Sequence, residues 1–226
     1  MRSCLGMLYQ CGVSAMNKVR FRYEKEGKAK YISHLDLMST MQRSFRRAGI
    51  RLKYSEGFNP HPYMSVALPL SVGYESSCEL IDVALIDNVI PDVNTVVLPE
   101  GITLIDSYTP GRKFNDIAWI KISGNLQYNN PVTQSMVDGL ENCLKKDSMI
   151  INKRTKRGHK DLDIAPYIKD ISFNKKDDIS FSAKISAQNP TINAEDLVNA
   201  LDDGLKPDFI SIRRVEIYDT DMIIFK

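Results

Sequence analysis

The sequence lacks several features that would narrow its function at once. Its four cysteines, Cys4, Cys11, Cys78 and Cys143, are widely spaced and form no C-x-x-C pair, which argues against a zinc ribbon and a disulfide scaffold. No window approaches eighteen uninterrupted apolar residues, so we expect no membrane-spanning helix. A strong excess of one charge is also missing, because 30 Lys and Arg residues stand against 28 Asp and Glu residues. The sparse cysteines indicate a reducing cytoplasm.

What remains is an ordinary globular composition, with 43% hydrophobic and 26% charged residues over 226 positions. This length suits one large domain or two small ones, each able to bury a core. Residues 1–15 differ from the rest. They contain a short, interrupted apolar run that faintly resembles a secretory signal, but no positive cluster precedes it. We interpret them as an extension outside the fold, with the domain structure beginning at Met16.

Residues 16–113 predict one ferredoxin-like unit. Residues 19–24 alternate apolar and polar side chains, which is typical of a strand with one buried face. Ser33 can cap a helix whose apolar positions recur at helical spacing, and Gly49 can end it. The order of elements is β-α-β-β-α-β once the loop at 55–62 and one extra extended piece are set aside. The later predicted elements are extended stretches at 50–54, 64–70, 79–86 and 101–108 and a short helix at 91–97.

Residues 114–226 repeat that order without repeating residue identities. The sequence therefore predicts an α+β protein made of two ferredoxin-like βαββαβ halves in tandem, divided near residue 113. The predicted elements of this half are strands at 118–123, 179–185 and 209–218, helices at 131–146 and from Asn193 to Gly204, and a basic hairpin at 153–160.

Two of the three histidines are expected to meet at one edge of the first half. In a right-handed β-α-β crossover, the helix begins at the edge where both parallel strands finish. We therefore expect the helix start, with His34, to lie near the loop that carries His61. A helix N-terminus favours an anion, and prolines stiffen this loop. The other predicted members of this corner are Lys30, Tyr31, Glu56, Phe58 and Asn59.

The residues of this corner can also be explained by purely structural roles. Ser33 and Asp36 are explained as a capping box, and each histidine could serve a loop or a helix turn alone. His34, Asp36 and His61 are legitimate metal ligands, but no ligand spacing accompanies them. We therefore predict no metal site and no cofactor.

Charge patterning is the second signal. Between Lys18 and Lys53, eleven basic residues stand against three acidic ones, a local net charge of +8. If the apolar residues of the first strand face the helices, Arg20 and Arg22 face outward on an open sheet and form a track for phosphates. The alternatives are simple solvation, compensation of the helix dipole, or an acidic protein partner. The other predicted RNA- or partner-binding residues are Arg43, Arg46, Arg47, Lys153, Arg154, Lys156 and Arg157.

Three phrases carry a family resemblance: KYISHLDLM at 30–38, RRAG at 46–49 and YSEGFNPHP at 54–62. They resemble the bacterial radical SAM-linked protein family, a family of unknown function encoded beside, or fused to, a radical SAM protein. Weaker similarity continues to residue 218, and the family's usual start lies near Met16. The resemblance implies a radical SAM protein as partner. Radical chemistry itself is not carried over, because the chain has no CxxxCxxC run.

Two classes of function follow. The first is a non-catalytic accessory module that binds RNA, or an RNA-associated partner, and presents it to a radical SAM enzyme. The second is a metal-independent RNA endonuclease, since tandem ferredoxin-like halves with a histidine at the first helix are similar to CRISPR repeat-processing endonucleases. There His34 would be the general acid or base, Tyr31 or His61 would assist it, and Lys30 would stabilise the phosphate. A pure protein–protein scaffold is the third possibility.

Overall fold

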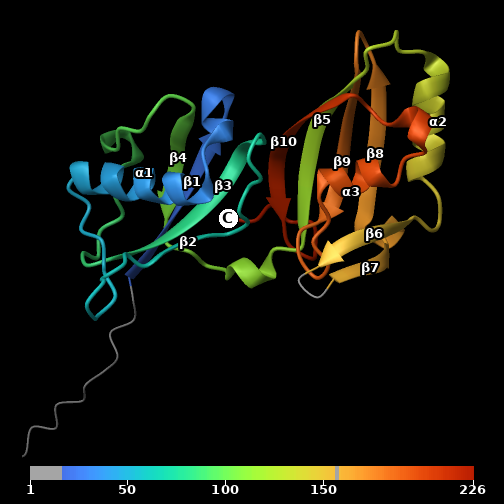
Figure 1. Cartoon of the computed structure of the whole chain (residues 1–226). Coiled ribbons are helices and arrows are strands. Elements are labelled where there is room, and N and C mark those ends of the chain that lie inside the picture. Colours follow the sequence, from blue (N-terminus) through green and yellow to red (C-terminus); the bar gives the residue numbers. More distant parts are fainter. Residues whose placement is uncertain (1–16, 156–157) are drawn as a thin grey trace, which may run out of the picture.

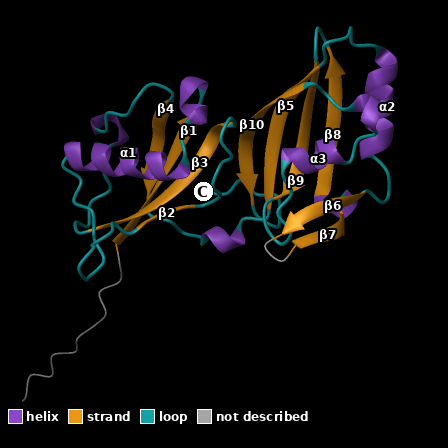
Figure 2. Cartoon of the chain, in the orientation of Figure 1, coloured by secondary structure: helices purple, strands orange, loops and turns teal. Residues whose placement is uncertain are grey.

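The computed structural model describes residues 17–155 and 158–226, and the side chains of residues 154 and 155 lie outside that description. Within these ranges, eight strands form one sheet and two more form a separate hairpin. Figure 2 shows that strands dominate, with the helices placed around them. The chain is therefore α+β, as predicted. None of its described helices is long and apolar enough to cross a bilayer. The predicted extension at 1–15 lies outside the described residues.

The first half follows the predicted order, with a 3-10 turn in place of the second helix. Strands β4, β1, β3 and β2 are neighbours in that order and pair antiparallel, which is the fourth-first-third-second order of a ferredoxin-like unit. The elements are β1 (Asn17–Lys25), η1 (Gly27–Tyr31), α1 (His34–Arg47), β2 (Met64–Val66), β3 (Glu75–Leu85), η2 (Val93–Thr95) and β4 (Ile102–Tyr108).

Helix α1 forms as the sequence predicts. The Ser33 hydroxyl accepts a hydrogen bond from the Asp36 N–H at 3.1 Å, and Gly49 ends the segment with a φ of 76°, in the left-handed region. Its apolar side packs on β1, where the rings of Phe21 and Phe45 stack with centroids 4.7 Å apart. Both rings are fully buried, so this contact anchors the core of the first half.

The second half repeats the ferredoxin-like order as β10, β5, β9 and β8. Leu140 of α2 and Leu197 of α3 share one core with Ile122 of β5, so both helices cover the same face of these strands. The predicted basic hairpin is confirmed as β6 and β7, inserted between α2 and β8. The elements are η3 (Phe114–Asp116), β5 (Trp119–Gln127), α2 (Gln134–Leu144), β6 (Ile150–Thr155), β7 (Gly158–Asp163), η4 (Ala165–Tyr167), β8 (Ile168–Lys175), β9 (Ile179–Ser186), α3 (Ala194–Asn199), η5 (Asp203–Leu205) and β10 (Phe209–Tyr218).

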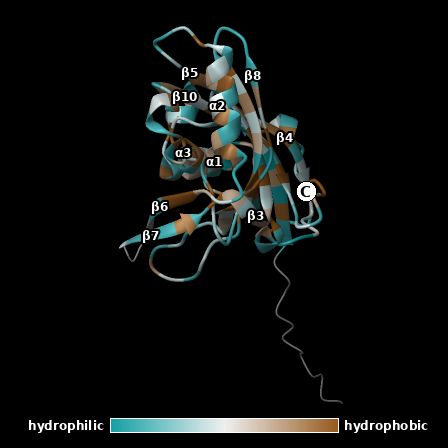
Figure 3. Cartoon of the chain, turned by 90° about the vertical axis from the view of Figure 1, so that its right-hand side faces the viewer, coloured by the Kyte–Doolittle hydropathy of each residue, from teal (hydrophilic) through white to brown (hydrophobic). Residues whose placement is uncertain are grey.

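The two halves join through a short parallel pairing of β3 with β10, visible at the centre of Figure 1. Arg214 of β10 reaches across this seam and bonds Glu79 of β3 at 2.7 Å, with side chains 9% and 2% exposed. Lys25 lies close by, and burial lowers the pKa of its ammonium group. Figures 1 and 3 place α1 and α3 on the same side of the strands. The predicted domain division near residue 113 stays a prediction.

Two local predictions are wrong. The stretch at 50–54 makes only isolated bridges, and the second strand of the unit is β2, so the loop at 55–62 precedes that strand instead of following it. The helix at 91–97 shrinks to the single turn η2. β-Branched residues fill this segment, and they favour extended backbone over helix.

Candidate nucleic-acid interface

The predicted phosphate track on β1 is wrong, because Arg20 is buried. Its side chain is 0% exposed and pairs with Asp82 through two bonds, Nε to Oδ1 at 2.7 Å and Nη2 to Oδ2 at 3.0 Å. Nη2 also donates to the carbonyl oxygen of Arg112 at 2.9 Å, and the guanidinium lies 4.3 Å from the centroid of the Phe114 ring. Arg20 is therefore held in internal contacts and offers no charge to a ligand, and its removal would leave Asp82 without its partner.

Arg22 is also committed to an internal contact. Its Nη2 pairs with Glu216 of β10 at 3.2 Å, and its side chain is 20% exposed. The burial of Arg20 comes from a cover over this face of β1, formed by residues 112–117 and the C-terminal residues 219–225, which place two aromatic rings against it. Arg112 fixes the cover with an ion pair and a hydrogen bond to the C-terminal segment. An alternating strand pattern shows which residues share a face, but not whether another segment covers it.

The three predicted arginines of α1 differ in availability. Nε of Arg46 donates to the Tyr54 hydroxyl at 2.7 Å. Nη2 of Arg47 donates to the Val97 carbonyl oxygen at 3.1 Å and so ties the segment after η2 to the helix. Arg43 is exposed, and its side chain makes no hydrogen bond or ion pair within the described part of the chain. It alone of the three is free to meet a ligand.

The predicted corner shared by His34 and His61 is wrong. His34 is the first residue of α1 and lines a small cavity with Glu79 of β3. The chain just after His61 lies elsewhere on β3, where the Ala84 N–H donates to the Tyr63 carbonyl oxygen at 2.9 Å. Ala84 and Glu79 are separated by about 17 Å along an extended strand. The corner fails because the loop enters before β2, at the opposite end of the sheet from the helix start.

The loop at 55–62 is nevertheless a well-defined and exposed projection. The N–H of Ser55 donates to the His61 carbonyl oxygen at 2.8 Å, and the N–H of His61 donates to the Ser55 hydroxyl at 2.9 Å. Gly57 adopts a φ of 118°, which side chains rarely tolerate. Phe58 next to it has a relative exposure of 105%, so its ring contacts solvent on all sides. The other predicted residues of this loop are also exposed: Glu56, Asn59 and His61.

The first lysine of the basic hairpin is not available to a ligand. Lys153 of β6 forms an ion pair with Asp196 of α3 and thereby holds the hairpin against that helix. The side chain of Arg154 lies outside the described residues, as do Lys156 and Arg157. Their binding role stays a prediction.

Lys30 and Tyr31 lie together at the end of η1. Nζ of Lys30 is 5.4 Å from the centroid of the Tyr31 ring and 3.7 Å from Oε1 of Glu75. They remain near the start of α1 but are separated from His61, so the endonuclease alternative loses one of its catalytic candidates. No group of three His, Cys, Asp or Glu side chains in the described ranges is placed to hold a metal ion.

A surface that the sequence did not reveal lies on the second half, on the face of the strands opposite α2 and α3. Directly opposed residues of antiparallel strands point to the same side, so the strand register gives the rows of side chains on this polar face. The first row, here called the lysine row, contains Lys121, Lys184 and Lys169. The second contains Arg213, Ser123, Ser182 and Ser172, and the third contains Ser211, Asn125, Ser180 and Asn174.

The second and third rows line a groove of about 610 Å³. This volume lies in the range of pockets that hold small molecules or parts of larger ones, about 300–1,000 Å³. The floor includes Gly124 of β5, where β5 and β10 lie so close that an added Cβ would be 2.1 Å from the Ser211 carbonyl oxygen. The groove thus presents hydroxyl and amide groups, which both donate and accept hydrogen bonds.

The lysine row borders the groove and carries positive charge, with Lys169 exposed and Lys121 and Lys184 half-buried. Nζ of Lys169 lies 4.1 Å from the centroid of the Trp119 ring. Lys184 pairs with Asp170 at 2.7 Å, and this hydrogen bond raises the pKa of the lysine. Lys121 makes no ion pair with any residue that the structure describes. On β10, the position opposite Lys121 is Glu216, whose charge is already paired across the seam.

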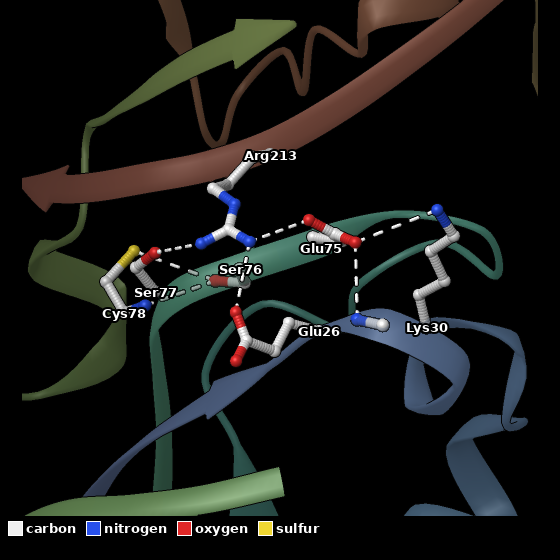
Figure 4. A network of polar contacts seen from close by, with 8 residues as sticks. Glu26, Lys30, Glu75, Ser76, Ser77, Cys78 and Arg213 are labelled. Carbon is white, nitrogen blue, oxygen red and sulfur yellow. Dashed lines mark hydrogen bonds and ion pairs between the residues drawn. The ribbon is translucent and has the colours of Figure 1, made fainter. Parts of the chain in front are cut away.

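Four charged residues cluster at the seam, as Figure 4 shows, and three of them, Lys30, Glu75 and Arg213, line the groove as its side wall. Arg213 donates to Glu75 at 2.7 Å and to Glu26 at 3.1 Å, and Lys30 completes the group. Burial alone would raise the pKa of Glu75, but hydrogen bonding, above all from Arg213, lowers it. With two acids and two bases, the cluster is close to neutral.

The sequence contained a weak signal for this face. In β9, ISFSAKIS alternates apolar residues with serine and lysine, and in β5, WIKISGNLQ does the same. Each pattern predicts a strand with one polar side. Neither pattern shows that the polar sides of four strands align in rows, or that this face stays uncovered while that of β1 does not.

Two solved structures are similar to the chain in outline. One is a crystal structure of a Cbf5-Nop10-Gar1 complex, with a TM-score of 0.49 and 11% identity over 89% of this chain and 49% of that one. The chain thus spans about half the length of that match. The other is Thermus thermophilus Cse3 bound to an RNA representing a pre-cleavage complex, with a TM-score of 0.19 and 12% identity over 86% of this chain and 98% of that one. Neither similarity is close enough to carry a functional argument.

No curated protein matches the chain. A family match is found, and it covers residues 18–200, most of both halves. These matches carry no link to radical SAM proteins. The chain belongs to the family described as an uncharacterized protein conserved in bacteria (DUF2344).

Proposed function

We propose that this protein is a non-catalytic RNA-binding module whose RNA contacts lie on the polar face of β5, β8, β9 and β10. The observation that carries the proposal is the alignment of a lysine row beside a groove lined with hydroxyl and amide groups. Lysines supply the sequence-independent attraction to phosphates, and polar groups supply contacts to bases and sugars.

The proposed RNA site lies away from the stretch of the sequence with the highest density of positive charge. Between Lys18 and Lys53, the charges of Arg20 and Arg22 are already neutralised by Asp82 and Glu216. The lysine row has fewer charges, but two of its members are free of ion pairs within the described residues. Accessible charge, and not total charge, attracts a polyanion.

A protein partner is the second candidate, and Phe58 is the observation that favours it. A fully exposed aromatic ring on a loop closed by backbone hydrogen bonds is suited to enter a pocket on another protein. A radical SAM protein, implied by the family resemblance, is the partner we propose. Two buried, free cysteines in the described residues, Cys78 and Cys143, favour work in a reducing compartment.

The test is binding of a fluorescently labelled, mixed-sequence single-stranded RNA across a salt series. Replacing two lysines, Lys121→Ala with Lys169→Ala, should flatten the log–log salt slope by about 1.4, taking about 0.7 per phosphate contact. The control pair Lys146→Ala with Lys206→Ala removes the same charge from exposed positions that follow α2 and η5 and should leave the slope unchanged. No binding by the wild-type protein at low salt would overturn the proposal and leave the protein-partner candidate. Cleavage of the RNA would restore the endonuclease alternative.

A further inference from the structure

The groove and the lysine row divide the polar face into a charged part and an uncharged part. Lys121 and Ser123 lie two residues apart on β5, so the two parts are about 7 Å apart along the strand. The positions facing the groove at its centre, Ser123, Ser182 and Asn125, carry no charge. A phosphate gains attraction over the lysines but finds no net charge inside the groove.

The charged residues of the side wall at the seam also leave the groove without free positive charge. Arg213 and Lys30 are the only cations among the described residues that line the groove, and Glu75 binds both of them. Because Glu26 takes a further hydrogen bond from Arg213, the guanidinium has little free charge for a phosphate. The groove therefore suits the neutral part of a nucleotide.

We propose that the protein binds single-stranded RNA with its phosphates over the lysine row and its unpaired bases in the groove. There, Ser123, Ser182 and Asn125 form hydrogen bonds with the base edges. This inference rests on the proposed RNA-binding function and adds the form of the RNA and the part of it that is read. Bases of a duplex are paired and stacked and cannot enter the groove, whereas a single strand can turn its bases outward. Serine and asparagine side chains can both donate to and accept from a base edge.

The test separates the reading of bases from attraction to phosphates. The probes are labelled eight-nucleotide homopolymers of each of the four ribonucleotides, with a mixed-sequence RNA duplex of equal charge. The wild-type protein should bind one or two homopolymers best and the duplex more weakly. Ser182→Ile fills the centre of the groove with a strand-compatible side chain at constant charge. It should weaken binding of the preferred homopolymer about tenfold, with the salt slope unchanged.

Ser123→Ala is the milder variant, and it keeps the test decisive if Ser182→Ile does not fold. Loss of one hydrogen bond should weaken binding of the preferred homopolymer about 2- to 12-fold and reduce the difference among homopolymers. The matched control is Ser65→Ile, an exposed strand serine of the first half, which should change neither quantity.

The outcomes distinguish this inference from the proposed function. Absence of RNA binding by the wild-type protein would defeat both. Binding that responds to the two lysines, but is equal for all homopolymers and unaffected by Ser182→Ile and Ser123→Ala, would overturn the inference alone. Tighter binding of the duplex than of every single strand would overturn it as well.

Discussion

The two halves share one strand order, yet they use the face of the sheet opposite their helices in different ways. In the first half, residues 112–117 and 219–225 cover that face. Its two arginines, Arg20 and Arg22, form ion pairs with Asp82 and Glu216. In the second half, the same face remains open and displays lysines, serines and asparagines in rows. A repeated fold therefore does not imply a repeated function, because the segments outside the unit decide which face can meet a ligand.

The strongest test of the covered face is Arg20→Met, which keeps much of the side-chain volume and removes the charge. Asp82 would keep a partly buried carboxylate without its partner, so the free energy of unfolding should fall by about 3–5 kcal/mol. Urea unfolding followed by circular dichroism measures it. Lys121→Met, on the open face, is the matched control and should change stability by no more than about 0.5 kcal/mol. Equal losses in the free energy of unfolding for the two variants would contradict the distinction between a covered and an open face.

Gly124→Ala tests the close approach of β5 to β10 in the second half. The added Cβ would lie 2.1 Å from the Ser211 carbonyl oxygen and 2.9 Å from Cε1 of Phe181, so strands β5 and β10 must shift. We expect a loss of about 1–3 kcal/mol, as for other overpacked sites, measured as a lower thermal midpoint. Gly111→Ala is the control, because nothing lies within 4 Å of its added Cβ. An unchanged midpoint for Gly124→Ala would show that the strands do not approach so closely.

The cover over the first face should weaken in acid through Asp219. Burial alone would raise the pKa of this carboxyl, but hydrogen bonds from the N–H groups of Ile223 and Asp221 outweigh it and lower the pKa. A carboxyl with a lowered folded pKa stabilises the protein above its unfolded pKa of about 3.9, and this stabilisation is lost as pH falls through the folded value. Asp219→Asn should therefore flatten the stability profile below about pH 4. Urea midpoints from pH 6 to pH 2 measure it, and parallel profiles for the two proteins would contradict the assignment.

The smallest structural effect is expected at Phe58, which belongs to neither face. Because its ring contacts only solvent, Phe58→Ala should change stability by no more than about 0.5 kcal/mol and leave RNA affinity unchanged. The same variant should reduce the recovery of a protein partner in co-purification from native cell extract. A clear loss of RNA affinity would instead place the loop within the RNA site.

The fold could be predicted from the sequence further than the site could. The capping of α1 by Ser33, its end at Gly49 and the alternation in β9 each depend on neighbours in the sequence, and all are confirmed. The order of elements then gave two ferredoxin-like halves. The prediction fails for the second strand of the first half, because residues 50–54 have a strand-like pattern but make only isolated bridges.

The site depended on contacts between distant residues, which local patterns do not contain. Arg20 reads as an outward residue from its alternation, and only the approach of residues 112–117 and 219–225, about 90 to 200 positions away, buries it. His34 and His61 were expected together because the order of loop and strand was inverted. Charge patterning does not predict the open face of the second half, because most of its side chains are serine and asparagine, which carry no charge.

The most direct test of the central claim is to map where RNA meets the protein by amide chemical shifts in solution. A single-stranded eight-nucleotide RNA is titrated into isotope-labelled protein at low salt. The account predicts that the largest chemical-shift changes occur on the polar face, at Lys121, Ser123, Lys169 and Ser182. The amide signals of β1 around Arg20 should not change. Largest shifts on β1 or in the loop at 55–62, with the polar face unchanged, would contradict it.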